Sequence, residues 1–510
     1  MSDYRLNPYT REYEYIPDGE PYVFGDRIYI YGSHDRFDGN KFCMNDYVCY
    51  SADLNDLTEW RYEGVIYSRK ADPRMMDGSR YLWAPDVCQG PDGRYYLYYC
   101  PDGDFAEIGV AVCDTPAGTY EYYDIVHDQE GVEIGRRPGD TIQFDPGVFR
   151  DDDGRIYLYS GNGPRIRKDI GKRPKASVVM ELEEDMVTVK GEPRKVLPVL
   201  GEADGDRDPE TYGGADLTSF AGHEMFEASS IRKIRGKYYL VYSSVAMHQL
   251  CYAVSDRPDG GYRYGGVLVS NADVFEEDTE IHAANPNLLN AWGNDHGGIE
   301  CINGEYYIFY HRQTQRSNFS RQGCAQKITL TEDGRFLQAE LTSQAFGEGP
   351  LPGEGIYPAS CVCHLHKNFK QAVSHQLAMG MKFPFLTQSG RDYDVEIWKQ
   401  AEARGEGVKK PPRQYITNFK DKSYALFRYF DLTKTKKVIV RLRGKATGTL
   451  YIRNGERGET LGQVEITPNT DWWLAKAEIT APLMQPEKGS EICLYFEGKG
   501  AIDILEFALK

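Results

Sequence analysis

The chain has 510 residues, more than one hydrophobic core usually serves, so we expect two or three domains. Its 60 basic and 77 acidic residues give a formal net charge of −17, which disfavours nucleic acid and anionic membrane as partners because both would repel it. Aromatic residues make up 13% of the chain, 38 of them tyrosines, and long apolar helical patterns are few, which favours an all-β protein.

The N-terminus, Met1-Ser2-Asp3-Tyr4-Arg5, shows no basic segment followed by an apolar run. We therefore expect no signal peptide and a cytoplasmic protein. No stretch approaches the roughly 20 apolar residues of a membrane helix. The 11 cysteines are scattered, and the closest pair, Cys361 and Cys363, fits no zinc template, so we expect mostly free, buried thiols.

A turn followed by an aromatic-rich strand occurs five times before residue 350. Asp-Gly or Asn-Gly ahead of alternating Tyr, Ile and Leu is a strong hairpin signal. The pattern returns about every 60–80 residues, which suits a blade of four strands, and five blades in a ring protect their sheet edges. We therefore predict a five-bladed β-propeller over residues 1–350. The five copies are residues 25–31, 92–98, 153–159, 235–242 and 303–310.

An acidic residue or a histidine precedes each of these hairpins by 8 to 10 residues. Because the strand before the first hairpin of a blade lines the central channel, this offset predicts that the side chains surround one axis. Asp145 and Glu227 also lie in apolar runs, where acids are rare unless they are paired or functional. The residues are Asp18, Asp86, Asp145, Glu227 and His296.

Five short motifs follow one another along this part of the chain. They are Pro17-Asp18-Gly19-Glu20-Pro21, Trp83-Ala84-Pro85-Asp86-Val87, Phe144-Asp145-Pro146, Phe226-Glu227-Ala228-Ser229 and His296-Gly297-Gly298-Ile299. In this order they resemble glycoside hydrolase family 43. The resemblance implies that Asp18 is the general base, that Asp145 orients the acid and that Glu227 is the general acid. One motif departs from the family, since His296-Gly297-Gly298 stands where His-Gly-Ser is usual.

The resemblance also implies inversion at the anomeric carbon. In that chemistry an ionised carboxylate takes a proton from water, while a neutral carboxyl group about 6.5–9.5 Å away protonates the leaving oxygen. Asp18 should then stay ionised. The pKa of Glu227 should be raised by burial and by a nearby negative charge, which we expect from Asp145.

Further residues are predicted to bind sugar or metal, and three of them have a plain structural alternative. Trp83 is a candidate stacking platform or a blade-core residue, and Arg312 a sugar-hydroxyl donor or half of a rim ion pair. Asp86 and Phe144 are candidate substrate contacts from their motifs. The resemblance implies one calcium ion in the axial channel, with His296 and otherwise mostly water as ligands; a hydrogen-bonded core histidine is the alternative.

The C-terminal third is predicted to be a separate all-β domain. Gly347-Glu348-Gly349-Pro350-Leu351-Pro352-Gly353 predicts a boundary, with a linker over 351–365 and a jelly-roll-like β-sandwich over 366–510. The ending Ala501-Ile502-Asp503-Ile504-Leu505-Glu506-Phe507 resembles the last strand of family 6 carbohydrate-binding modules. Sugar binding and bracing of the propeller are both open for this domain.

Several functions fit these features. The first is an exo-acting α-L-arabinofuranosidase or β-xylosidase that trims oligosaccharides. An exo-β-galactosidase or an endo-arabinanase fits the same fold, and a non-catalytic sugar-binding propeller is the alternative of another class. The sugar, the linkage and the oligomeric state are left open.

Overall fold

The computed structural model describes residues 4–103, 107–163, 174–275, 288–371, 382–390, 392, 411–482 and 488–510. These residues form strands and a few short 3-10 helices, with no α-helix among them. The 3-10 helices are η1 (Arg69–Ala71), η2 (Pro209–Tyr212), η3 (Leu217–Phe220) and η5 (Ala359–Cys361). In the described part of the chain, no helix has the length and apolar character needed to cross a membrane.

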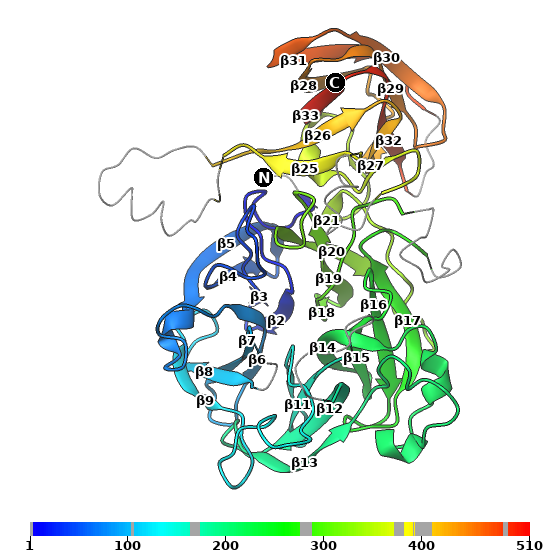
Figure 1. Cartoon of the computed structure of the whole chain (residues 1–510). Coiled ribbons are helices and arrows are strands. Elements are labelled where there is room, and N and C mark those ends of the chain that lie inside the picture. Colours follow the sequence, from blue (N-terminus) through cyan, green and yellow to red (C-terminus); the bar gives the residue numbers. More distant parts are fainter. Residues whose placement is uncertain are drawn as a thin grey trace.

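Five antiparallel sheets surround a central axis, as predicted (Figure 1). The first is β2 (Glu20–Phe24), β3 (Arg27–Tyr31), β4 (Tyr47–Asp53) and β5 (Asp56–Tyr67). The second is β6 (Leu82–Gln89), β7 (Tyr95–Pro101), β8 (Gly109–Cys113) and β9 (Glu121–Ile125). The third is β10 (Gly147–Arg150), β11 (Ile156–Asn162), β12 (Ala176–Leu182) and β13 (Val189–Lys195). The fourth is β14 (Met225–Ile234), β15 (Lys237–Ser244), β16 (Gln249–Ser255) and β17 (Arg263–Ser270). The fifth is β18 (Ile299–Ile302), β19 (Glu305–Gln313) and β20 (Arg321–Ile328).

The fifth blade differs from the prediction of four strands in every blade. Its described sheet has three hydrogen-bonded strands. Beside β20 lies β21 (Gln344–Phe346), which pairs with β1 (Arg5–Leu6) from the start of the chain. The Asn7 side chain fastens this segment to β20, because it donates to Ala325 O at 3.0 Å and accepts from Ala325 N at 3.0 Å. The N-terminal segment therefore closes the ring at blade five.

The first hairpin of every blade turns at a glycine with a left-handed backbone. Gly93 has φ 86° and Gly154 has φ 89°, and a Cβ at either position would meet no atom within 4 Å. The backbone angle, rather than lack of space, therefore favours glycine at these turns. The aromatic strand that follows is buried, as in β7 and β15.

Each interface between neighbouring blades has its own hydrophobic cluster. Blades one and two share Ile66 and Leu97, blades two and three Val110 and Leu158, and blades three and four Val179 and Leu240. Blades four and five share Val241 and Ile308, and blades five and one share Phe309 and Ile30. The five clusters close the ring and fix the innermost strands β2, β6, β10, β14 and β18 around the axis.

The C-terminal part is a sandwich of two six-stranded sheets, which confirms the predicted fold class. One sheet holds β22 (Leu351–Pro352), β24 (His364–Lys367), β27 (Ser423–Asp431), β29 (Thr447–Arg453), β30 (Thr460–Ile466) and β32 (Ser490–Lys499). The other holds β23 (Gly355–Pro358), β25 (Phe385–Gln388), β26 (Gln414–Lys420), β28 (Lys437–Gly444), β31 (Asn469–Glu478) and β33 (Ala501–Leu509).

The residues predicted as a linker, 351–365, are not a free connection. They carry β22 and β23, which pair with β27 and β33 of the sandwich. The Gly/Pro-rich stretch marks where the chain leaves blade five, but alternation within 355–358 lets it add an edge strand. The sandwich also bonds to the propeller through a buried ion pair, in which Arg428 Nη2 lies 2.5 Å from Asp273 Oδ2.

All 11 cysteines are free thiols, and all but Cys113 and Cys301 are buried. This confirms the expectation of mostly free, buried thiols.

Candidate active site

The three predicted catalytic acids lie at the same end of three innermost strands. Asp18 comes just before β2, Asp145 just before β10, and Glu227 is near the start of β14. Their exposed fractions are 4%, 4% and 9%, so all three side chains are nearly buried. Asp18 and Asp145 have positive φ angles, 57° and 45°, which non-glycine residues seldom adopt outside functional or tightly constrained positions.

Glu227 lies in an irregular stretch of β14. The register of β14 against β15 shifts on both sides of Glu227, and the next residue, Ala228, has φ 72°. A bulge of this kind redirects a side chain that would otherwise alternate along the strand. The bulge therefore turns the Glu227 carboxyl group toward the axis, where it meets amides from two other segments.

Asp18 is held as an anion by two cationic or hydrogen-bonding neighbours. Arg321 Nη1 lies 2.9 Å from its Oδ1, and His311 Nδ1 lies 3.2 Å from the same oxygen. Burial alone would raise the pKa of Asp18, but the charge of Arg321 and the contacts with His311 hold it well below its usual range. Asp18 is thus an ionised carboxylate at neutral pH.

Glu227 has the opposite environment. Burial first, and the charge of Asp18 second, raise its pKa to about 7, although hydrogen bonds from two amides act against this. Asn162 Nδ2 donates to Glu227 Oε2 at 3.2 Å, and Asn294 Nδ2 donates to Oε1 at 3.4 Å. We expected a nearby negative charge from Asp145; Asp18 supplies one such charge, and Glu227 interacts with Asp145 as well. Two carboxyl groups with pKa values driven apart are the mark of an acid–base pair.

Asp145 interacts electrostatically with both of the other acids. Burial, then the charges of Glu227 and Asp18, raise the pKa of Asp145 well above its usual range. Its Oδ2 lies 3.6 Å from Nδ1 of His296, so the predicted channel histidine does adjoin the acids. Burial lowers the pKa of His296 to about 4, so its ring is neutral at neutral pH.

Asp86 lies at a different level from the three acids, and its role as a substrate contact stays a prediction. It is 0% exposed, and its oxygens accept from Tyr22 Oη at 2.7 Å and from Val148 N at 2.6 Å. With Glu20 and Arg232 it forms a charged cluster below the three acids. The physical reason lies in the offset: Asp86 precedes its hairpin by 8 residues, whereas the three catalytic acids precede theirs by 9 or 10.

The same lower cluster accounts for Gly298, where the resemblance leads one to expect serine. A Cβ at this position would lie 2.6 Å from Glu20 Oε2 and 2.7 Å from Ser230 Oγ. Ser230 Oγ itself donates to Glu20 Oε2 at 2.8 Å. The hydroxyl group of Ser230, from blade four, therefore lies where a serine side chain at position 298 would be.

Trp83 and Phe144 are adjacent. Their ring centroids are 5.2 Å apart in an edge-on arrangement, with Trp83 half-buried and Phe144 buried. Phe144 directly precedes Asp145 in the chain, so this ring pair lies next to one of the three acids. Whether these rings stack on a sugar stays a prediction.

The model of glycosyl hydrolases family 43 matches residues 16–336, which contain all three acids and the five blades. A xylosidase/arabinosidase of Thermoclostridium stercorarium is 44% identical over 512 residues, covering 100% of this chain and 99% of the relative.

The chain belongs to glycosyl hydrolases family 43.

A second curated relative matches a smaller share of the chain. A xylosidase/arabinosidase of Bacteroides ovatus is 30% identical over 64% of this chain and 95% of its own length. Among solved structures, a family 43 arabinoxylan arabinofuranohydrolase from Bacillus subtilis in complex with cellotetraose covers 99% of this chain and 97% of its own, with 18% identity and a TM-score of 0.49. The likeness of the sandwich to family 6 carbohydrate-binding modules stays a prediction.

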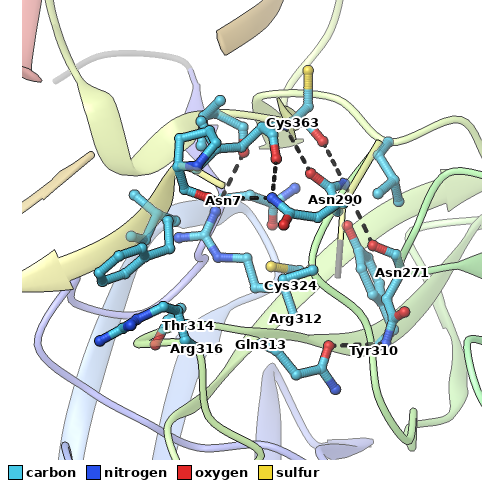
Figure 2. A pocket seen from close by; sticks show the side chains of 18 of the residues that line it. Asn7, Asn271, Asn290, Tyr310, Arg312, Gln313, Thr314, Arg316, Cys324 and Cys363 are labelled. Carbon is cyan, nitrogen blue, oxygen red and sulfur yellow. Dashed lines mark hydrogen bonds between the residues drawn. The ribbon is translucent and has the colours of Figure 1, made fainter. Parts of the chain in front are cut away.

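Arg312 does not lie with the acids of this family 43 site. Its Nη1 donates to Ser360 O of η5 at 2.7 Å, and its Nη2 donates to Gln322 Oε1 at 2.9 Å. Figure 2 shows it beside the cavity between the propeller and the sandwich. The side chain points to the domain interface in this structure, and its contact with sugar hydroxyls stays a prediction.

Few other potential metal ligands lie near His296, the predicted calcium ligand. His296 Nε2 lies 3.8 Å from Glu20 Oε1, a buried oxygen without a hydrogen-bond partner. No group of three or more His, Cys, Asp or Glu side chains suited to a metal occurs in the described ranges. Among the described residues, His296 would then be the one predicted protein ligand, with water completing the shell, and we assign the ion no part in the reaction.

Four side chains of the site were not predicted from the sequence: Arg321, His311, Asn162 and Asn294. Arg321 begins β20 in the last blade, and its register partner is Gln313. Nothing in the sequence separates it from Arg312, since both are single arginines in the same hairpin. Only the closure of the ring, which brings blade five against Asp18 of blade one, distinguishes them.

Proposed function

We propose that this family 43 enzyme is an inverting exo-glycosidase that removes terminal xylose or arabinofuranose residues from oligosaccharides derived from plant polysaccharides. The observation that carries the proposal is the contrast between Asp18 and Glu227. Arg321 keeps Asp18 ionised, while burial and the Asp18 charge raise the pKa of Glu227 to about 7. The pentose specificity is supported by the relative from Thermoclostridium stercorarium, which matches over the whole chain.

In this proposal Asp18 is the general base. As a carboxylate it takes a proton from the water that attacks the anomeric carbon. Arg321 and His311 lie against its Oδ1, which leaves its Oδ2 for the water. The same contacts keep the group from being protonated in the acidic range.

Glu227 is the general acid. Its neutral carboxyl group donates a proton to the glycosidic oxygen as the bond to the anomeric carbon breaks, and the charge left on Glu227 is accommodated by Asn162 and Asn294. These amides favour the ionised form, so they stabilise the product state of the proton transfer. Asp145 orients Glu227 and modulates its pKa through their mutual charge interaction.

The test is a panel of nitrophenyl glycosides, together with arabinan, assayed with wild type and Glu227→Gln. We expect β-D-xylopyranoside or α-L-arabinofuranoside to be the best substrate. On the matching disaccharide, whose departure needs the acid, Glu227→Gln should lower kcat by about 10²–10⁴. A preference for β-D-galactoside, or for internal bonds of arabinan, would replace the proposed substrate. Full activity of Glu227→Gln on that disaccharide would refute its role as the acid.

Cytoplasmic location and calcium binding through His296 stay proposals. Metal analysis of the purified protein and of His296→Gln addresses the second: bound calcium in the first and none in the variant is the expected result.

A further inference from the structure

Three side chains converge on the backbone carbonyl of Asn294. His311 Nε2 and Gln313 Nε2 each lie 2.7 Å from this oxygen, and Asn271 Nδ2 lies 3.4 Å from it. A carbonyl oxygen has two lone pairs, so three donors saturate it. The backbone of residue 294 is therefore held from several directions.

The contacts that hold the backbone of Asn294 also position its side chain, which binds Glu227. The side chain of the same residue, Asn294 Nδ2, donates to Glu227 Oε1 at 3.4 Å. The bulge in β14 leaves Glu227 without regular strand neighbours on either side, so this contact and the one from Asn162 define its direction. Movement of Asn294 would therefore displace the Glu227 carboxyl group.

The other ring nitrogen of His311 faces Asp18. Nδ1 lies 3.2 Å from Asp18 Oδ1 and accepts from Asp18 N at 3.4 Å. Because a carbonyl only accepts, Nε2 must carry a hydrogen. Nδ1 then accepts the Asp18 N–H in the neutral ring, or donates to Oδ1 in the charged ring. In either state the ring stays in contact with Asp18.

The His311 ring is fixed by its own surroundings. It is 0% exposed, and its backbone N–H donates to Asp295 Oδ1 at 3.0 Å. Asp295 Oδ1 also accepts from the backbone N–H of His296, at 3.1 Å. A buried ring with both nitrogens engaged and its backbone anchored has little freedom to move.

The Asn294 segment is anchored on the sandwich side as well. Asn290 Nδ2 donates to Cys363 O at 2.7 Å, and Leu365 N donates to Asn290 Oδ1 at 3.0 Å. Figure 2 shows Asn290 and Cys363 above a cavity of about 50 Å³, with Asn271 and Gln313 also lining it. Residues 290–294 therefore run from a contact with the sandwich to the carbonyl that His311 holds.

We propose that His311 is a positioning residue that sets the spacing between the two acid–base groups. Its Nδ1 lies against Asp18, and its Nε2 holds the backbone carbonyl of Asn294, whose side chain binds Glu227. This inference rests on the proposed function, in which Asp18 is the base and Glu227 the acid. An inverting reaction depends on a gap that admits one water between these groups, and a misplacement of about 1 Å can lower the rate about 10²-fold.

Two substitutions test the two ring nitrogens of His311 separately. In His311→Gln the amide takes the place of Nε2, so the bond to Asn294 survives and the contact with Asp18 is lost. In His311→Asn the amide takes the place of Nδ1, so the contact with Asp18 survives and the bond to Asn294 is lost. Both are assayed in the full chain with a 2,4-dinitrophenyl glycoside, whose departure needs little protonation, and with the matching disaccharide, whose departure needs the acid.

We expect different patterns from the two variants. His311→Asn lowers kcat on the disaccharide about 10–100-fold and on the dinitrophenyl glycoside much less, because only the acid is displaced. His311→Gln lowers both about equally, because the base serves both substrates. Gln313→Leu, which also removes a donor to the Asn294 carbonyl but makes no contact with Asp18, should follow His311→Asn more weakly.

The outcomes separate this inference from the proposed function. Equal losses on both substrates in His311→Asn and Gln313→Leu, or no loss in either, would overturn the positioning role. Gln313→Leu provides this test even if a His311 variant fails to fold. Glu227→Gln is the reference: if it shows no dependence on the leaving group, the assignment of the acid fails, whatever the His311 variants show.

Discussion

Arg321 and Asp18, 303 positions apart in the chain, form a buried ion pair with Nη1 2.9 Å from Oδ1. The same guanidinium also donates from Nε to Asp35 Oδ2 at 2.9 Å and from Nη2 to Asp35 Oδ1 at 3.1 Å. One planar cation thus joins the start of blade one to the last hairpin of blade five. It closes the ring and keeps the proposed base ionised.

Replacing Arg321 by lysine should make Asp18 easier to protonate. A single ammonium cannot serve Asp18 and both oxygens of Asp35 together. Because Arg321 lowers the pKa of Asp18, the variant should raise that pKa, and the acidic limb of kcat/KM should move to higher pH. The pH dependence on an aryl glycoside measures this.

Arg312→Lys is the matched control, since Arg312 lies in the same hairpin but bonds to Ser360 O at the domain interface. Its acidic limb should not move. An equal displacement in both variants would show that the charge of Arg321 does not act on Asp18.

Asp145→Asn addresses the interaction between the two buried carboxyl groups. The pKa of Asp145 is raised by burial, then by Glu227 and Asp18, and such coupling is mutual. Removing the charge should lower the pKa of Glu227, so the alkaline limb of activity should move to lower pH. A limb that stays in place or moves upward would leave Asp145 with an orienting role alone.

The order of the blades and the three acids could be predicted from the sequence because the hairpin turns and apolar motifs are local. Asp86 does not meet the three acids, because an offset shorter by one or two residues places its side chain at the next level of the inner strands, near Glu20 and Ser230. Arg321 and His311 could not be found, since their partner Asp18 meets them only when the ring closes. The extra strands at 351–358 depend on pairing with β27 and β33, far along the chain.

Gly298→Ser should destabilise the propeller. A Cβ there would lie 2.6 Å from Glu20 Oε2 and 2.7 Å from Ser230 Oγ, both in a buried cluster. Overpacking of this kind costs about 1–3 kcal/mol in the free energy of unfolding. Urea denaturation measures the loss. The double variant Gly298→Ser, Ser230→Ala should recover part of it, because one of the two close atoms is gone; no recovery would mean that Ser230 is not what excludes the side chain.

The interface between the propeller and the sandwich should depend on Asp273. Burial would raise its pKa, but His364 at 2.5 Å and Arg428 at 2.5 Å lower it. A carboxylate with a lowered pKa stabilises the fold above its unfolded pKa of about 4 and less as the pH falls toward its folded value. Asp273→Asn should therefore cost about 3–5 kcal/mol at neutral pH, with a smaller difference from wild type in acid.

Thermal unfolding at several pH values measures this effect. Asp333→Asn is the control, because Asp333 forms an exposed pair with Arg335 at 2.8 Å, and such pairs contribute about 0–1 kcal/mol. Similar losses in the two variants would contradict a specific role for the buried pair.

The most direct test of the central claim is the configuration of the sugar at the moment of release. Proton NMR of the first minutes of hydrolysis, before the free sugar equilibrates, distinguishes the anomers. With Asp18 as base and Glu227 as acid, a β-xyloside should give α-xylose first, and an α-L-arabinofuranoside the β-anomer. Initial release of the same anomer as the substrate would contradict the account, because Asp18 would then have to act as a nucleophile.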